Sequence, residues 1–295
     1  MHVHVVDGTY EIFRYHFALP SHVTDAGREV AATRGVVGSM LTLLDDGATH
    51  VGIATDHVIE SFRNDLWAGY KTSEGMPPEL LGQFDLLEDA LTTAGFTVFP
   101  MVEFEADDAM AAAAAVADAD PRVDKVWICT PDKDLGQCVV DDRVVQLDRR
   151  KGVEIDAAGV EERFGVPPGS IPDYLALVGD SADGFPGLPG WGAKSAAAVL
   201  ARYLRLEDIP AASADWDVSV RGAGKLAVTL QDQFELALLF RRIATVERDA
   251  PTVTDVEQLR WMGPSPEFRA LAEMLEAPNL AARAERLADT RQSRG

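Results

Sequence analysis

Cysteine, long apolar runs and positive charge are all scarce in this chain. Its 295 residues include only two cysteines, Cys129 and Cys138, too few for a disulfide framework or a cysteine-rich zinc site. No apolar run is long enough to span a bilayer, and residues 1–4 lack the basic flank and apolar segment of a signal peptide. We therefore expect a soluble protein of the reducing cytoplasm that has no membrane partner.

Acidic residues outnumber basic ones, with 48 Asp and Glu against 27 Lys and Arg, and the net charge is −21. This excludes a uniformly basic nucleic-acid binder, so any contact with nucleic acid must use a local basic patch. The excess acid is compatible with solvated surface and with bound divalent cations. The hydrophobic fraction of 47% is enough for one large core or two modest domains.

Short apolar runs alternate with helical patterns in the first half of the chain. Strands are predicted at residues 3–6, 51–55, 97–102, 126–130 and 144–147, and helices around residues 36–44, 78–94 and 109–117. This alternation predicts an α/β fold with a mainly parallel sheet. After about residue 165 the patterns are only helical, with helices expected at about 172–179, 193–203 and 267–287. The tail, residues 289–295, is expected to be disordered.

Acidic residues follow four of these predicted strands. Because the carboxyl ends of parallel strands share one edge of a sheet, we expect these side chains to converge: they are Asp7, Asp56, Glu105, Asp107, Asp108, Asp132 and Asp134. Like charges about 4 Å apart repel by about 4 kcal/mol at an effective dielectric of about 20, so such a cluster needs protonation or bound cations. Oxygen ligands alone suit Mg²⁺ or Mn²⁺. The alternative for each acid is that it caps a helix N-terminus.

A basic and aromatic set lies between the second and third predicted strands. Arg63, Tyr70 and Lys71 combine positive charge with a ring, a combination that can grip phosphate and stack on a base. A plain surface helix is the alternative interpretation of the same residues.

The Gly- and Pro-rich residues 179–195 lie between two predicted helices. Glycines let backbone N–H groups approach a ligand closely, and the second helix presents its positive end, so the segment predicts a phosphate cradle. Its residues are Gly187, Gly190, Gly192, Lys194 and Ser195. An ordinary helix–turn–helix corner is the alternative, but Asp180 and Asp183 in the same loop favour a functional role.

Taken in order, these motifs resemble the 5′-nuclease family, which includes flap endonucleases and the 5′→3′ exonuclease domain of bacterial DNA polymerase I. The six motifs are Val6-Asp7-Gly8, Asp56, Glu105-Ala-Asp-Asp108, Thr130-Pro-Asp-Lys-Asp134, Gly179-Asp-Ser-Ala-Asp183 and Gly190-Trp-Gly-Ala-Lys194. The similarity spans roughly residues 3 to 250. Each motif alone is weak evidence, but six in the family's order are specific.

The resemblance implies a PIN-like α/β nuclease core over residues 1–165 and a helical region over 166–262. The helical region would hold duplex DNA with a helix–three-turn–helix (helix–hairpin–helix) motif, which in the family often has a bound K⁺. A C-terminal extension would follow over 263–295. Nine acids match the family's metal ligands: Asp7, Asp56, Glu105, Asp107, Asp108, Asp132, Asp134, Asp180 and Asp183. Arg14, Arg63, Tyr70 and Lys71 match residues that meet the scissile phosphate or the 5′ side of the substrate. Lys194 and the glycines before it match the duplex-phosphate contact.

The implied function is a structure-specific 5′→3′ exonuclease or flap endonuclease that hydrolyses DNA with two Mg²⁺ or Mn²⁺ ions. Its substrates would be 5′ flaps, nicked or branched duplexes and RNA primer ends. A monomer is implied, and because the chain stops at residue 295 a free-standing nuclease is expected.

Two positions depart from the family pattern. Glu74 stands where a second basic residue often follows the Tyr-Lys pair, and Gly184 stands where an Asn usually follows the last metal Asp. The alternative functions are a flap or junction DNA-binding protein with weak or lost nuclease activity and, more distantly, a PIN-type ribonuclease.

Overall fold

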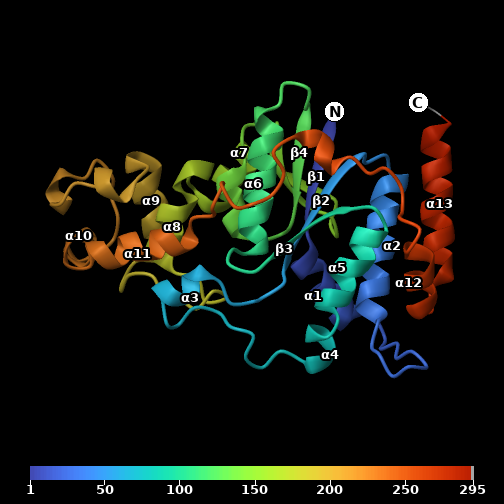
Figure 1. The fold of residues 1–295 in the computed structure, drawn as a ribbon. Helices are drawn as coiled ribbons and strands as arrows, with labels where there is room; N and C mark the ends of the chain where they lie inside the picture. Colours follow the sequence, from blue (N-terminus) through green and yellow to red (C-terminus); the bar gives the residue numbers. More distant parts are fainter. Residues whose placement is uncertain (294–295) are drawn as a thin grey trace. The chain divides into compact units, whose positions relative to one another are not determined.

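The computed structural model describes residues 1–293, which fall into two compact units (Figure 1). Unit 1 consists of Met1–Ile59, Ser73–Thr130 and the segment from Arg248 onward, and unit 2 consists of Glu60–Thr72 and Pro131–Glu247. Among the described residues, no helix is both long enough and apolar enough to cross a membrane.

Unit 1 contains most of the sheet. Its elements in chain order are β1 (His2–Asp7), α1 (Gly8–Ala18), α2 (Ala31–Asp45), β2 (His50–Asp56), α4 (Pro78–Leu81), α5 (Phe84–Thr93), β3 (Thr97–Met101), α6 (Ala106–Ala119), β4 (Lys125–Cys129), the 3-10 helix η5 (Val256–Leu259), α12 (Phe268–Met274) and α13 (Pro278–Gln292). The four strands pair in parallel in the order β3-β2-β1-β4. Val5 of β1 stands in register with Gly52 on one side and Ile128 on the other. The prediction of an α/β fold with a mainly parallel sheet is confirmed.

The strands of unit 1 are apolar because both faces of the sheet are covered. Val3, Val5 and Val6 of β1 are buried, as runs of β-branched residues are in parallel sheets. The alanine-rich helix α6 packs against all four strands, and its small side chains let it lie close to them. In Figure 1, α6 lies on one side of these strands, and α1, α2 and α5 lie on the other. The carboxyl ends of the strands are therefore held between two layers of helices.

The single helix predicted at residues 78–94 is wrong in one respect, because the chain breaks it into α4 and α5. Gly82 ends α4, where its N–H bonds back to the carbonyl oxygen of Pro78. Gln83 then turns its side chain to α2, and its Oε1 accepts hydrogen bonds from the N–H and the hydroxyl of Thr33. A tertiary hydrogen bond thus competes with helix continuity at this point.

The prediction of a disordered tail at residues 289–295 is also wrong, up to the last described residue. Helix α13 continues to Gln292, and Arg291 donates to the carbonyl oxygens of Leu44 and Ala48 at the end of α2. The guanidinium thus ties the last helix to the end of α2 and to the loop that follows it. Residues 294–295 lie outside the described residues.

Unit 2 is mostly helical. Its elements are α3 (Phe62–Leu66), η1 (Lys133–Cys138), β5 (Val144–Asp148), β6 (Val153–Ile155), α7 (Ala157–Phe164), η2 (Pro168–Ser170), α8 (Ile171–Val178), α9 (Ala193–Tyr203), η3 (Leu206–Asp208), η4 (Ser213–Asp215), α10 (Ala223–Asp232) and α11 (Phe234–Ala244). Strands β5 and β6 form an antiparallel pair. The sequence analysis identified β5, α8 and α9 but missed β6 and α7.

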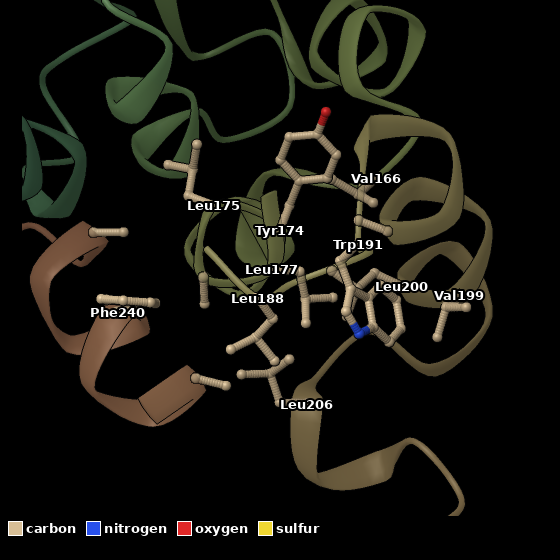
Figure 2. Close-up of a cluster of buried hydrophobic side chains, with 14 of the residues drawn as sticks. Val166, Tyr174, Leu175, Leu177, Leu188, Trp191, Val199, Leu200, Leu206 and Phe240 are labelled. Carbon is tan, nitrogen blue, oxygen red and sulfur yellow. The ribbon is translucent and has the colours of Figure 1, made fainter. Parts of the chain in front are cut away.

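Helix α8 is the centre of the unit 2 core. It packs against both α9 and α11, and seven of its eight residues are buried, so its apolar surface extends all round the helix. Figure 2 shows Leu175 and Leu177 of α8 among Leu200 of α9, Phe240 of α11 and the loop residue Leu188. The core therefore anchors both helices that flank the Gly- and Pro-rich loop.

This loop crosses its own backbone at two glycines. Gly179 and Gly187 both have positive φ, at 80° and 69°. A Cβ on Gly179 would lie 2.4 Å from the carbonyl carbon of Pro186, and one on Gly187 would lie 2.4 Å from the backbone nitrogen of Gly179. Only glycine fits at either position, because a Cβ on one segment would overlap the backbone of the other.

Candidate functional site

The carboxylates that follow the strands of unit 1 are fixed at the carboxyl end of its sheet. Asp7 ends β1, and its two oxygens accept from the N–H of Tyr10 at 2.7 Å and the hydroxyl of Thr130 at 2.9 Å. Asp56 ends β2, and its Oδ1 accepts from the N–H of Ala106 at the start of α6, at 2.7 Å. The backbone N–H of Asp56 donates to the hydroxyl of Thr9, just after β1, and this bond ties the two strand ends together. Asp7 and Asp56 therefore both accept hydrogen bonds from the first turn of a helix that starts at this edge of the sheet.

The three acids at the start of α6 differ in exposure. Glu105 and Asp108 are buried, and Asp108 Oδ2 accepts from the N–H of Glu105 at 2.9 Å in a capping box. Asp107, between them, is half-buried. Because the Asp56 carboxylate bonds to the adjacent Ala106, these acids lie around the same helix end as Asp56. The hydrogen bond to Ala106 thus places Asp56 beside the acids of α6, while the capping interpretation holds for several of the same residues.

A second acidic cluster lies within unit 2. Oxygen atoms of Asp134, Asp180 and Asp183 all lie within 4.8 Å of one another, in an arrangement that could hold a metal ion. Asp134 and Asp180 are buried and Asp183 is half-buried. Asp132 caps η1, where its Oδ1 accepts from the N–H of Asp134 at 2.9 Å. The tertiary fold thus joins the acids after the fourth strand to the Gly- and Pro-rich loop, some 45 residues further along the chain.

Asp134 is the least stabilised carboxylate of this cluster. Its Oδ1 is buried and accepts no hydrogen bond, although Lys133 Nζ lies 3.3 Å away. Burial raises the pKa of Asp134 well above its usual range, and repulsion from Asp132 and Asp183 raises it further. Lys133 also pairs with Asp180. Burial disfavours the charged form of Lys133, but attraction to Asp134 and the bond to Asp180 outweigh it and raise the lysine pKa.

The charge of the unit 2 cluster fits a divalent cation. Asp132, Asp134, Asp180 and Asp183 are countered there by Lys133 and by Lys71, whose Nζ lies 3.1 Å from Asp183 Oδ1. The four carboxylates outnumber these two ammonium groups, and a divalent ion would add positive charge. Oxygen-only ligands and a buried Asp134 oxygen without a donor suit a hard ion such as Mg²⁺.

Arg63 and Tyr70 are buried in the structure, whereas Lys71 is partly exposed. Arg63 is 2% exposed, and its guanidinium donates to the carbonyl oxygens of Ile243 at 2.8 Å and Thr245 at 3.0 Å. Tyr70 is 4% exposed and belongs to the apolar core of unit 2. The side chain of Lys71 is 32% exposed beside Asp183, and its backbone N–H donates to the carbonyl oxygen of that residue. Of the three, Lys71 is the one that can reach a ligand without leaving a buried position.

Arg14 lies on α1 in unit 1 with a partner that the sequence analysis missed. Its guanidinium pairs with Glu11, which is buried one turn after Asp7. Burial works against the charged guanidinium, but the hydrogen bond to Glu11 outweighs this and raises the pKa of Arg14. The spacing of three residues within one helix was the available signal for this pair.

The N-terminus of α9 borders a cavity of about 590 Å³ in unit 2. Gly190, Gly192, Lys194 and Ser195 line it, and so does Arg221, which the sequence analysis did not identify. Ser195 Oγ accepts from the N–H of Gly192 at 3.0 Å and so caps the helix itself. Lys194 and Arg221 are exposed, and neither forms an ion pair with another described residue. Two cations and a positive helix end make this cavity suitable for an anion; Gly187, in contrast, lies at the backbone crossing.

Gly184 and Glu74, the two departures from the family pattern, lie in different structural environments. Gly184 has a φ of 83°, and a Cβ there would lie 2.0 Å from the carbonyl oxygen of Gly69, so no larger residue fits. The carbonyl of Gly184 accepts from the indole of Trp67 at 3.0 Å. Glu74 is exposed in unit 1.

Comparison with known families identifies two consecutive matches. Residues 2–165 match the 5′-3′ exonuclease N-terminal resolvase-like domain, and residues 166–267 match the 5′-3′ exonuclease C-terminal SAM fold. DNA polymerase I of Mycobacterium leprae is 34% identical over 264 residues, which are 87% of this chain and 28% of the polymerase. DNA polymerase I of Pseudomonas aeruginosa is 31% identical over 265 residues, or 86% of this chain and 28% of the polymerase. The chain therefore spans under a third of the length of these relatives.

Solved structures of low sequence identity share the fold. A bacteriophage T5 5′-exonuclease with bound zinc matches with a TM-score of 0.64 and 17% identity, over 98% of this chain and 99% of the other. A T5 flap endonuclease in complex with DNA and metal ions matches with a TM-score of 0.59 and 20% identity, over 98% and 100%. Flap endonuclease-1 of Methanococcus jannaschii matches with a TM-score of 0.59 and 17% identity, over 98% and 93%. The predicted resemblance to the 5′-nucleases is confirmed.

Proposed function

This chain belongs to the 5′-3′ exonuclease family, and we propose that it hydrolyses phosphodiester bonds at the 5′ ends or flaps of branched DNA with divalent metal ions. The observation that carries the metal part of the proposal is the Asp134–Asp180–Asp183 cluster, with its buried Asp134 oxygen that accepts no hydrogen bond. The proposed substrates are 5′ flaps, nicked or branched duplexes and RNA primer ends.

Two groups of carboxylates are proposed to hold the ions, which we take to be Mg²⁺ or Mn²⁺. Unit 1 offers Asp7, Asp56, Glu105, Asp107 and Asp108, and unit 2 offers Asp132, Asp134, Asp180 and Asp183. When bound, such ions lower the pKa of a coordinated water and offset the charge of the leaving oxygen. The hydrogen bonds that Thr130 and Ala106 donate to Asp7 and Asp56 hold these two acids in place before any ion arrives.

Lys71 is the proposed cationic group for the phosphoryl oxygens. Its ammonium is partly exposed and held by Asp183, so it can offset negative charge that develops in the transition state. Arg63 takes a supporting role in this proposal: its bonds to Ile243 and Thr245 hold α3 against the end of α11, and Lys71 follows α3. Arg14 on α1, paired with Glu11, is the proposed contact to the 5′ side of the substrate.

The cavity at the start of α9 is the proposed contact to the duplex. Lys194, Arg221 and the N–H groups near Gly190 and Gly192 would bind a backbone phosphate, and a K⁺ ion in the same loop would add positive charge. A chain with net charge −21 depends on such a local patch, so binding should weaken steeply with added salt. We further propose a monomer in the cytoplasm, where cysteines such as the buried Cys129 and Cys138 stay reduced.

The test is cleavage of a 5′-labelled flap by wild type and Asp107→Asn in Mg²⁺, Mn²⁺ and EDTA. Wild type should cut only with metal, and Asp107→Asn should lose cutting while retaining the fold. The matched control is Asp156→Asn, because Asp156 caps α7 through Gly159 but belongs to neither cluster. That variant should cut normally, which separates the loss of a metal ligand from the loss of a helix cap.

Two results would count against the proposal. Full cutting by Asp107→Asn would contradict a metal-binding role for Asp107 and the neighbouring carboxylates of unit 1. Tight flap binding by wild type, with no cutting in either metal, would instead favour a flap- or junction-binding protein.

A further inference from the structure

His57, Asp85 and Glu88 form a third polar cluster, which the proposed nuclease function does not use. His57 directly follows β2, and Asp85 and Glu88 lie one turn apart on α5. One ligand atom from each residue lies within 4.8 Å of the others, and all three residues belong to unit 1. The cluster differs from the carboxylate clusters because it contains an imidazole.

The three side chains present their donor atoms to one point. His57 Nδ1 lies 2.8 Å from Glu88 Oε2 and 3.7 Å from Asp85 Oδ1. Ligands of a tetrahedral zinc ion at about 2.0–2.2 Å from the metal are separated by roughly 3.3 Å, a value that these two distances bracket. Small rotations of the exposed side chains would therefore bring all three atoms to bonding distance of one ion.

The surroundings fix the carboxylate and leave an entry path. Glu88 is 8% exposed, and its second oxygen, Oε1, accepts from the buried hydroxyl of Thr55 at 2.8 Å. Such a bond from a neighbouring group orients a metal ligand. The side chains of His57 and Asp85 are 38% and 80% exposed, so an ion can enter from solvent and keep water in its remaining positions. Zn²⁺ binds the neutral imidazole, so the two carboxylates supply the negative charge that balances the ion.

We propose that His57, Asp85 and Glu88 form a binding site for a transition-metal ion of the Zn²⁺ type, separate from the carboxylate clusters. A nitrogen ligand beside two carboxylates suits Zn²⁺, whereas Mg²⁺ prefers oxygen ligands alone. This preference would let the site take Zn²⁺ while Mg²⁺ fills the oxygen-only clusters.

The test measures Zn²⁺ binding to the full chain by competition with a chromogenic zinc chelator. Mg²⁺ is present at about 10 mM, in large excess over Zn²⁺, so that it fills the oxygen-only clusters. Wild type should bind one Zn²⁺ ion that His57→Ala does not bind. Thr55→Val should weaken this Zn²⁺ by roughly tenfold, because Glu88 loses the group that orients it.

The matched control is His22→Ala. His22 Nε2 also lies 2.8 Å from a glutamate, Glu276, and its side chain is 39% exposed, but no third ligand stands beside that pair among the described residues. This variant should bind Zn²⁺ as wild type does, and circular dichroism should show native folds throughout. Equal Zn²⁺ stoichiometry and affinity in wild type and His57→Ala, or no Zn²⁺ bound by wild type under Mg²⁺, would overturn the proposal.

Discussion

Replacing Arg63 should damage the fold of unit 2, whereas replacing Lys71 should damage only the chemistry. Arg63→Met retains much of the aliphatic volume but removes a buried guanidinium that donates to Ile243 and Thr245. Hydrogen bonds to charged groups contribute about 1.5–3 kcal/mol each, so the loss of two should cost about 3–6 kcal/mol. For a unit of this size we expect the melting temperature to fall by roughly 10–25 °C.

Lys71→Ala removes an ion pair of a partly exposed ammonium, which contributes about 0–1 kcal/mol to stability. If Lys71 stabilises charge in the transition state, its loss should lower kcat by about 10²-fold or more. Urea unfolding and single-turnover flap cleavage, run on both variants, separate the two effects. The control is Arg163→Met, which removes an exposed guanidinium that lies over Phe164, as that of Arg63 lies over Phe62.

A different pattern would refute this reasoning. If Arg63→Met unfolds at the wild-type urea concentration but loses cleavage as strongly as Lys71→Ala, then Arg63 acts on the substrate. Its bonds to the two carbonyls would then not describe the working state of the protein.

Three further predictions concern single sites. Gly184→Ala should destabilise unit 2 by more than about 2 kcal/mol, whereas Gly27→Ala, at a similar φ of 79° with no atom within 4 Å of a Cβ, should cost less in the same urea titration. Asp134→Asn should raise the melting temperature in EDTA, because a buried carboxylate without a donor is removed, and should abolish the stabilisation by Mn²⁺; an unchanged Mn²⁺ response would contradict its role as a ligand. Burial lowers the pKa of His50 below 6.5, so the folded state favours the neutral imidazole. The resulting contribution to the free energy of unfolding is fully present above about pH 6.5 and is lost as the pH falls through the folded-state pKa. The unfolding free energy should therefore drop less between pH 7 and pH 5 in His50→Gln than in wild type, and equal drops would exclude this contribution.

Local sequence patterns determined most of the elements and the chemical type of the site. The apolar runs that form β1, β2 and β3 are short, bounded by polar residues and separated by helical periodicity. Consecutive residues are therefore enough to predict that they are strands. The same holds for the acids after each strand, because a strand end and a helix start are both local features. Where the pattern failed, at Gln83 and in α13, the deciding contacts came from Thr33, Leu44 and Ala48, far away in the chain.

Tertiary structure alone decided which of these residues can do chemistry. The sequence places Arg63 and Lys71 in one basic segment, but folding buries the first against carbonyls of residues 243 and 245 and leaves the second beside Asp183. It likewise brings Arg221 to the cavity of Lys194 and turns His57 towards Glu88. Burial and pairing depend on residues that are distant in sequence, and a charge acquires its energetic role only from them. The sequence therefore shows which chemical groups are present, but packing decides which of them are exposed and which residues they contact.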